Sequence, residues 1–253
     1  LPNISNLAEK GIVFNNAFSN APVCSVARST IITGVYAPSI GTQYHRKASP
    51  VNLPKNIRPL PLYLKDAGYY TTNNNKEDYN FKKENEIWDE SSSKATYKNR
   101  KGKQPFFHVQ NFGNTHEGRL HFDEEYFKRE IENFNIENTP TFPYHPDTPI
   151  FRFSRELLYK HHMSLDSKIG EFIKDLEKQG LMENTIIFYY GDHGGVLPRS
   201  KGYLYESGLN IPMVVYVPKK WKNLSPFHIG TKTSAFIDFL DLVPTVLSLA
   251  GIE

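Results

Sequence analysis

A cysteine with an arginine one helical turn beyond it could support nucleophilic chemistry in this sequence. Cys24 is the single cysteine of the 253 residues, and Arg28 follows four positions later. If a helix begins at Cys24, its free N–H groups form an anion site and Arg28 shares its face. Such a position favours the reactive thiolate, although a lone cysteine can also be a small buried core residue. We interpret Cys24 as a candidate nucleophile.

An acid and an imidazole stand side by side after a continuous apolar run. Residues 185–190 (TIIFYY) are typical of a buried strand, and Asp192 and His193 follow between glycines. Carboxylate and imidazole ligands at the carboxyl end of a strand suit a divalent metal ion. The other interpretation is a polar turn, and this segment alone does not decide between the two.

Three further side chains that could handle an anion also follow predicted strands. Lys76 comes after residues 69–73, His116 after residues 105–112, and Lys201 shortly after Asp192. Cations can clamp an anion, and a histidine at a strand end is placed for acid–base work, although each could be a solvated loop residue. Together with Cys24 these residues suit transfer of a tetrahedral oxyanion, either sulfuryl or phosphoryl.

Alternating strands and helices must position these side chains. The pattern predicts an α/β fold with a mainly parallel central sheet and helices on both faces, whose site lies at the carboxyl ends of the strands. The charged segment 82–104 is predicted to be a surface excursion, and the proline-containing segment 117–153 a long ordered loop or lid. We expect strands at 12–18, 69–73, 105–112, 185–190 and 212–217, and helices at 3–11, 24–33, 60–67, 154–180 and 235–249.

Composition narrows the possible partners. The chain has 30 basic and 27 acidic residues, a net charge of +3, which is too balanced to indicate a nucleic-acid partner. No run approaches the ~18 apolar residues of a membrane span, so we expect none. A single cysteine excludes an internal disulfide. The chain begins at Leu1 without a signal peptide, and we expect a processed or truncated piece.

The order of the motifs resembles the type I, formylglycine-dependent sulfatases of the alkaline-phosphatase superfamily, polysaccharide sulfatases in particular. The resemblance covers nearly the whole chain. It implies an alkaline-phosphatase-like fold and a calcium-dependent sulfuric ester hydrolase acting on a sulfated polysaccharide or oligosaccharide. The matching segments, in order, are NAPVCSVARSTIITG, AGYYTTNNNKEDYNF, PFFHVQNFGNTHEG, YYGDHGGVLPRSKG and FIDFLDLVPTVLSLAGIE.

The resemblance implies a role for each of five catalytic residues. Cys24 would be oxidised to formylglycine by a maturation enzyme, and the hydrate of that aldehyde would be the nucleophile. Arg28 would hold the hydrate. Lys76 and Lys201 would bind the sulfate oxygens, and His116 would contact the sulfate ester or protonate the leaving oxygen.

It also implies the metal ligands and a set of substrate contacts. Asp192 and His193 would ligate Ca²⁺. Side chains near the motifs that could contact sugar or anionic groups are His45, Arg46, Asp78 and Arg119, with Tyr36, Tyr44 and His121 nearby.

The sequence departs from the family pattern at several points. Val26 stands where the family usually has Pro, and Asp78 where many members have His. The family's first metal motif, an aspartate pair, would precede Leu1, and its C-terminal subdomain would follow Glu253. We therefore expect residues 1–253 to be a sulfatase catalytic domain without those two parts, periplasmic or secreted by family analogy. Two alternatives remain: a phosphoester or phosphonate hydrolase on the same scaffold, or an inactive homologue that binds sulfated glycans.

Overall fold

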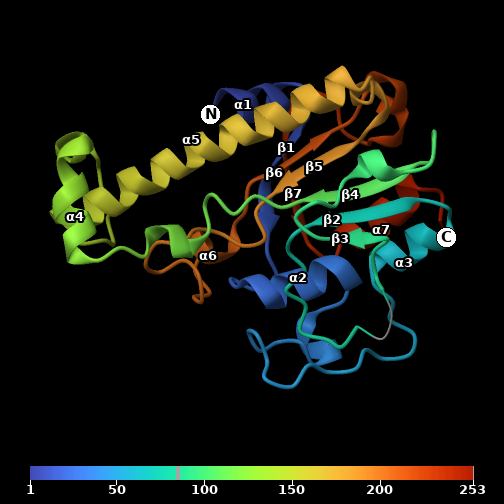
Figure 1. The fold of residues 1–253 in the computed structure, drawn as a ribbon, viewed down its shortest axis with the longest axis horizontal. Helices are drawn as coiled ribbons and strands as arrows, with labels where there is room; N and C mark the ends of the chain where they lie inside the picture. Colours follow the sequence, from blue (N-terminus) through green and yellow to red (C-terminus); the bar gives the residue numbers. More distant parts are fainter. Residues whose placement is uncertain (84–85, 253) are drawn as a thin grey trace.

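Two β-sheets with helices on both faces make up the computed structural model, which describes residues 1–83 and 86–252 (Figure 1). The α/β class expected from the sequence is confirmed. Of the segment 82–104, positions 84 and 85 lie outside the described residues, as does position 253.

The larger sheet is mixed. Its strands are β1 (Ile12–Phe18), β5 (Ile187–Tyr190), β6 (Met213–Tyr216) and β7 (Thr231–Asp238), in the order β5-β6-β1-β7. Strand β6 is antiparallel to both β5 and β1, whereas β1 and β7 are parallel. The apolar run at 212–217 is thus a strand, but it is not the parallel strand we expected. Burial on both faces selects apolar residues whichever way a strand runs, so the sequence pattern did not reveal its direction.

The smaller sheet is wholly parallel. It comprises β2 (Tyr70–Asn74), β3 (Glu90–Ser91) and β4 (Phe106–Gln110), with β2 in the centre. Strand β3 lies in the segment 82–104 that we expected to be a surface excursion, and Ile87, Trp88 and Tyr97 of that segment are buried. That expectation is corrected, because a few large apolar side chains among many charges suffice to dock the segment on the sheet.

Helices cover the two faces of the sheets. Helices α1 (Pro2–Glu9) and α5 (Pro149–Lys178) lie on one face, where Leu7 packs with Val214 and Tyr216. Helices α2 (Cys24–Thr33), α3 (Leu60–Asp66) and α7 (Leu242–Leu249) lie on the other, where Ile32, Leu64 and Val243 share a hydrophobic cluster. Short 3₁₀ turns and helix α6 (Glu206–Leu209) complete the elements described.

Two helix boundaries differ from those expected. Helix α5 begins at Pro149 instead of Ser154, and the segment 117–153 contains helix α4 (Glu124–Glu130), which projects from the body at the far end of α5 (Figure 1). The segment 235–249 is a helix only from Leu242, because residues 235–238 complete β7 by pairing with β1. Pro244 then falls in the first turn of α7, where a missing N–H costs no hydrogen bond.

Among the described residues, no helix combines the length and the apolar character that crossing a membrane requires.

Candidate active site

Helix α2 begins at Cys24, as the sequence predicted. Val23 precedes it in an extended conformation, with φ −155° and ψ 140°, and its carbonyl oxygen accepts a hydrogen bond from the Ala27 N–H at 3.1 Å. Gly34 ends the helix in the left-handed region at φ 68°. Cys24 is buried, with 1% of its surface exposed, so its side chain lies at the helix N-terminus with no free access to bulk water.

The turn after β5 holds Asp192 and His193 rigidly. The Gly194 N–H donates to the Gly208 carbonyl at 2.8 Å, and the approach is so close that a Cβ at Gly194 would lie 2.4 Å from the carbonyl oxygen of Ser207. The Ser19 hydroxyl, at the end of β1, donates to the Asp192 carbonyl at 2.9 Å. Glycine is therefore required at position 194 for packing, and the polar-turn interpretation accounts for part of this motif.

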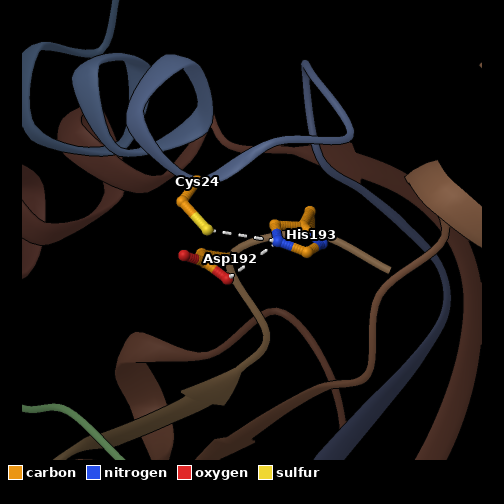
Figure 2. A group of neighbouring side chains, drawn as sticks. All are labelled: Cys24, Asp192 and His193. Carbon is orange, nitrogen blue, oxygen red and sulfur yellow. Dashed lines mark hydrogen bonds and ion pairs between the residues drawn. The ribbon is translucent and has the colours of Figure 1, made fainter. Parts of the chain in front are cut away.

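Figure 2 shows Cys24, Asp192 and His193 converging. The Cys24 sulfur lies 3.4 Å from His193 Nε2, which is 3.9 Å from Asp192 Oδ1. Possible ligand atoms of the three residues all lie within 4.8 Å of one another. His193 Nδ1 lies 3.0 Å from the Gly194 carbonyl, which fixes its proton there and leaves Nε2 as a lone-pair ligand. Burial lowers the pKa of His193 and favours this neutral form.

Arg28 ties this cluster to the neighbouring sheet. Its Nε donates to Asp192 Oδ2 at 2.8 Å, and one terminal nitrogen donates to the Lys76 carbonyl at 3.2 Å. Burial opposes ionisation of Asp192, but the positive charges of Arg28 and Lys76 and the hydrogen bond from Arg28 outweigh it and lower the pKa of the carboxyl group. Asp192 is therefore an anion at neutral pH.

The ends of β2 and β4 bring Lys76 and His116 to the same pocket. The Asn111 amide donates to Asn73 Oδ1 and to the Asn74 carbonyl, both at 3.0 Å, and so ties the two strand ends together. The pocket is lined by Cys24, Arg28, Asn75, Lys76, Asn111, Phe112, Gly113, Thr115, His116, Glu117, Gly191, Asp192, His193, Gly194 and Val196. Four of the five predicted catalytic residues and both predicted metal ligands therefore line one pocket.

His116 is held as a neutral imidazole with a defined tautomer. Its Nδ1 accepts a hydrogen bond from the Gly118 N–H at 3.1 Å, so the ring proton resides on Nε2. Burial and the ammonium groups of Lys76 and Lys201 lower the pKa of His116. The ring can thus donate a hydrogen bond from Nε2 to an anionic or leaving oxygen.

Lys201 reaches the pocket edge through an acidic residue that the sequence reasoning did not single out. Its largely buried ammonium forms an ion pair with Glu117 and has no hydrogen bond to any other described residue. Glu117 follows His116 and lines the pocket. The hydrogen bond from Lys201 lowers the pKa of Glu117, so this carboxyl group is ionised at neutral pH. The sequence offered one signal for a role of Glu117, which was its position directly after the predicted catalytic residue His116.

The predicted substrate contacts lie around the pocket and not among its lining residues. His45 Nδ1 and Ser25 Oγ are 2.8 Å apart, and Arg46 pairs with Asp78 at 3.2 Å. Asp78 is also 3.9 Å from the Lys76 ammonium, so the residue at the family's usual histidine position neutralises both cations. Arg119 is exposed in a 3₁₀ turn. Its side chain has no polar contact with other described residues.

Asp192 and His193 offer two donor atoms to a divalent metal ion. Asp192 Oδ1 accepts no hydrogen bond from the described residues, and His193 Nε2 presents its lone pair on the same side. These two atoms fit part of such a site. Calcium takes six to eight oxygen ligands, so other oxygen atoms must complete its coordination.

Comparison with known proteins identifies the family. The sulfatase family model matches residues 1–252 of this chain. The chain therefore belongs to the sulfatase family, whose members have alkaline-phosphatase-like folds, and the family implies a bound metal ion. This confirms the family and the fold class that the motif order suggested.

Individual relatives and structures support the same placement. An ulvan-active sulfatase of Formosa agariphila is 38% identical over 99% of this chain and 48% of its own length. Human N-sulphoglucosamine sulphohydrolase is 25% identical over 97% of this chain and 55% of its length. The chain thus spans about half the length of these relatives. A solved structure with its substrate D-glucosamine-2-N,6-O-disulfate has a TM-score of 0.69 at 18% identity, covering 100% of this chain and 72% of that one.

Proposed function

We propose that this protein hydrolyses sulfate esters of sugars at the pocket that contains Cys24. One observation carries the proposal: a nucleophile position, three cationic or imidazole side chains and a pair of metal-ligand donors line one pocket, although they come from four separate segments. The cationic side chains and a metal ion would neutralise the negative charge of the sulfate, and the nucleophile would attack its sulfur atom.

The nucleophile would be formylglycine made from Cys24. As a hydrate, one hydroxyl would attack the sulfur atom and displace the sugar oxygen; the second hydroxyl would then lose its proton, expel the bound sulfate and restore the aldehyde. Arg28, on the same face of α2, is placed to hold that oxygen, and its ion pair with Asp192 fixes the guanidinium. His193 Nε2, 3.4 Å from the Cys24 sulfur, brings the pair of metal-ligand donors beside the nucleophile position.

Lys76, Lys201 and His116 would divide the work on the ester. The two ammonium groups neutralise the sulfate oxygens as point charges. To bind sulfate, Lys201 would release Glu117 and pair with a sulfate oxygen, so one anionic partner replaces another. Glu117 could then accept a hydrogen bond from a sugar hydroxyl. His116 donates from Nε2 to the oxygen that leaves with the sugar.

Asp192 and His193 would hold a calcium ion. Bound there, the ion would supply a positive charge against the sulfate oxygens and the nucleophile. The ionised Asp192 and the neutral His193 are already in the protonation states that a metal requires.

The substrate would be a sulfated carbohydrate, polysaccharide or oligosaccharide. This assignment rests on the relatives' names, which include an ulvan-active sulfatase, and on a structural neighbour solved with a disulfated glucosamine. A formylglycine-generating enzyme would mature Cys24, and export to the periplasm or medium is proposed by analogy with the family.

A phosphonate or phosphate ester hydrolase is the second candidate. Phosphonate monoester hydrolase of Agrobacterium radiobacter has a TM-score of 0.74 with this chain at 16% identity, covering 100% of it and 69% of that chain. At that identity the likeness concerns the fold alone. The same pocket charges could also serve a phosphoryl oxyanion, so the two ester classes must be compared directly.

Sulfate release decides between the candidates. Matured protein is incubated with D-glucosamine-2-N,6-O-disulfate, carrageenan oligosaccharides and phenyl phosphonate, and free anions are measured by ion chromatography. We expect sulfate release from at least one sugar, its loss after exhaustive chelation and its recovery on adding Ca²⁺. Faster cleavage of the phosphonate than of every sulfate ester would replace the proposal with the second candidate. No release from any ester would contradict both.

A further inference from the structure

A row of exposed aromatic rings and guanidinium groups lies on the loop that carries Lys201 and on the segment beside it. The rings of Phe142 and Tyr144 stack at 5.4 Å, and those of Tyr203 and Tyr205 at 6.3 Å. All four rings are at least 38% exposed. Arg199 joins the two stacks, and Arg155 caps the outer one, 4.1 Å from the Phe142 ring centroid. We call these six residues the aromatic–arginine row.

Arg199 is the centre of the row. Its guanidinium carbon lies 4.8 Å from the Tyr144 ring centroid and 4.2 Å from that of Tyr205. The side chain is exposed and makes no hydrogen bond or ion pair with any described residue. The two rings hold the guanidinium in place while its N–H donors remain unused.

The backbone around Arg199 is held by specific contacts. The Ser207 hydroxyl donates to the Arg199 carbonyl at 2.6 Å, and buried His145 contacts the Pro198 carbonyl through Nε2 at 2.8 Å. Arg199 itself has φ 67°, a left-handed conformation that costs a non-glycine residue free energy. The position of the guanidinium is therefore set before any ligand arrives.

Along the chain, the row flanks Lys201, whose ion-pair partner Glu117 lines the pocket that contains Cys24, called here the proposed sulfate pocket. Arg199 is two residues from Lys201, whose ammonium pairs with the pocket residue Glu117. The Gly202 N–H donates to the Pro22 carbonyl at 2.8 Å, two residues before Cys24, and so fixes the loop against the nucleophile segment. A sugar unit that extends from the pocket past Lys201 would therefore lie beside the residues that flank this lysine in the chain, Arg199 and Tyr203.

We propose that Arg199, Tyr144 and Tyr205 form a second subsite, which binds an anionic sugar unit adjoining the unit whose sulfate ester is cleaved. The inference rests on the proposed function for the position of the first unit. Both tyrosine rings already pack against Arg199 and against a stacked neighbour, Phe142 or Tyr203, so they would contact a sugar through their exposed edges and hydroxyl groups. The unused donors of Arg199 match a carboxylate or a sulfate, which a guanidinium binds through two parallel hydrogen bonds.

Binding is measured in the full chain with Cys24→Ala, so that turnover cannot consume the ligand. Calorimetry with a heparin-derived hexasaccharide, which carries carboxylates and sulfates, is compared with D-glucosamine 6-O-sulfate. Arg199→Gln keeps the side-chain length and removes the charge. Arg58→Gln is the control for removing an exposed guanidinium packed on a ring: Arg58 lies 5.0 Å from the Tyr63 ring centroid, and it differs from Arg199 in pairing with Asp66 at 2.8 Å.

Arg199→Gln should weaken hexasaccharide binding by roughly tenfold and leave the monosaccharide unchanged, while Arg58→Gln alters neither by more than about twofold. A carboxyl-reduced hexasaccharide identifies the anion: a smaller Arg199 effect on it assigns the carboxylate, and an equal effect assigns a sulfate. Equal behaviour of the two arginine variants, or no hexasaccharide binding by the Cys24→Ala parent, overturns the subsite.

Two further outcomes separate this inference from other accounts. If matured protein releases no sulfate from any sugar while Arg199→Gln still weakens the hexasaccharide, the proposed function fails and the anionic-sugar site stands. If Arg199→Gln changes the sedimentation coefficient and not hexasaccharide affinity, the row is a protein interface and the subsite is wrong.

Discussion

The proposed sulfate pocket and the aromatic–arginine row differ in how the chain builds them. Cys24 and His193 are 1% and 8% exposed and stand at the ends of a helix and a strand. Tyr144 and Tyr205 are 39% and 47% exposed and lie in loops. Regular elements fix the group that reacts, whereas loops on a rigid scaffold carry the groups that vary. The comparison predicts that the chemistry of the proposed site and its choice of substrate can be altered separately.

The largest expected effect is in the pocket, at Cys24. Cys24→Ala should lower kcat for a sugar sulfate by roughly 10⁴-fold or more, because no other described side chain occupies the nucleophile position. Sulfate release and the thermal unfolding midpoint are measured together on the same preparation. Release within tenfold of the parent, by a folded variant, would remove Cys24 from the chemistry.

His116 should distinguish leaving groups. His116→Ala is expected to lose ~10²–10⁴-fold in kcat on a sugar sulfate and far less on nitrophenyl sulfate, whose phenolate leaves without a proton. The neutral Nε2–H tautomer, fixed by the Gly118 N–H, is the structural reason. Rates are compared on both substrates, and equal losses would leave His116 as a plain sulfate contact.

Lys201 and Arg199 provide a direct contrast between the two regions, although only one residue separates them. Lys201→Ala should cost about 10²-fold in kcat/KM on a monosaccharide sulfate, with KM raised and kcat lowered, as for loss of one charge-stabilising group. Arg199→Gln should leave that substrate unchanged. Steady-state kinetics of the two variants provide the check. An equal loss of kcat/KM in both would show that the pocket and the row do not have separate roles.

The smallest effect on activity is expected at Asp166, beneath the opposite face of the sheet. This buried carboxylate of α5 accepts hydrogen bonds from the Ile4 N–H at 2.8 Å and the Asn3 N–H at 3.2 Å, and so caps α1. Asp166→Asn should lower the free energy of unfolding by ~1–3 kcal/mol at pH 7 without changing KM. Glu171→Gln, on the exposed side of α5, is the matched control.

The same carboxylate predicts a pH dependence. Burial opposes its ionisation, but the hydrogen bonds from Ile4 and Asn3 outweigh burial and lower the pKa of Asp166. A lowered folded-state pKa stabilises the protein above the unfolded value of about 3.9, and this contribution is lost as pH falls through the folded value. Urea unfolding should show the gap between parent and Asp166→Asn narrowing below about pH 4. A gap constant down to pH 3 would contradict this assignment.

Local sequence signals were sufficient to predict the part of the site formed by the start of α2 and the turn at Asp192. The start of α2 and the turn at Asp192 follow from short-range rules, since Gly34 ends the helix and an apolar run precedes the acid. The Glu117–Lys201 pair joins residues 84 positions apart, and no spacing rule predicts it.

Longer-range pairing explains the wrong boundaries. Residues 235–238 have helical spacing, but β1 provides a parallel partner for them, and Asp238 and Asp241 form the turn into α7 through their own hydrogen bonds. The early start of α5 had a signal, Pro149 in its first turn, which our interpretation of the proline-containing loop overlooked.

Conversion of Cys24 provides the most direct test of the central claim, that this pocket cleaves sulfate esters through a formylglycine. Preparations made with and without a formylglycine-generating enzyme are analysed by mass spectrometry of the Cys24 peptide and by sulfate release from the same sugar sulfate. The account predicts that the rate rises in proportion to the aldehyde fraction and extrapolates to zero for the thiol. Equal sulfate release from the thiol-only preparation, or none from the fully converted one on any sugar sulfate, would contradict it.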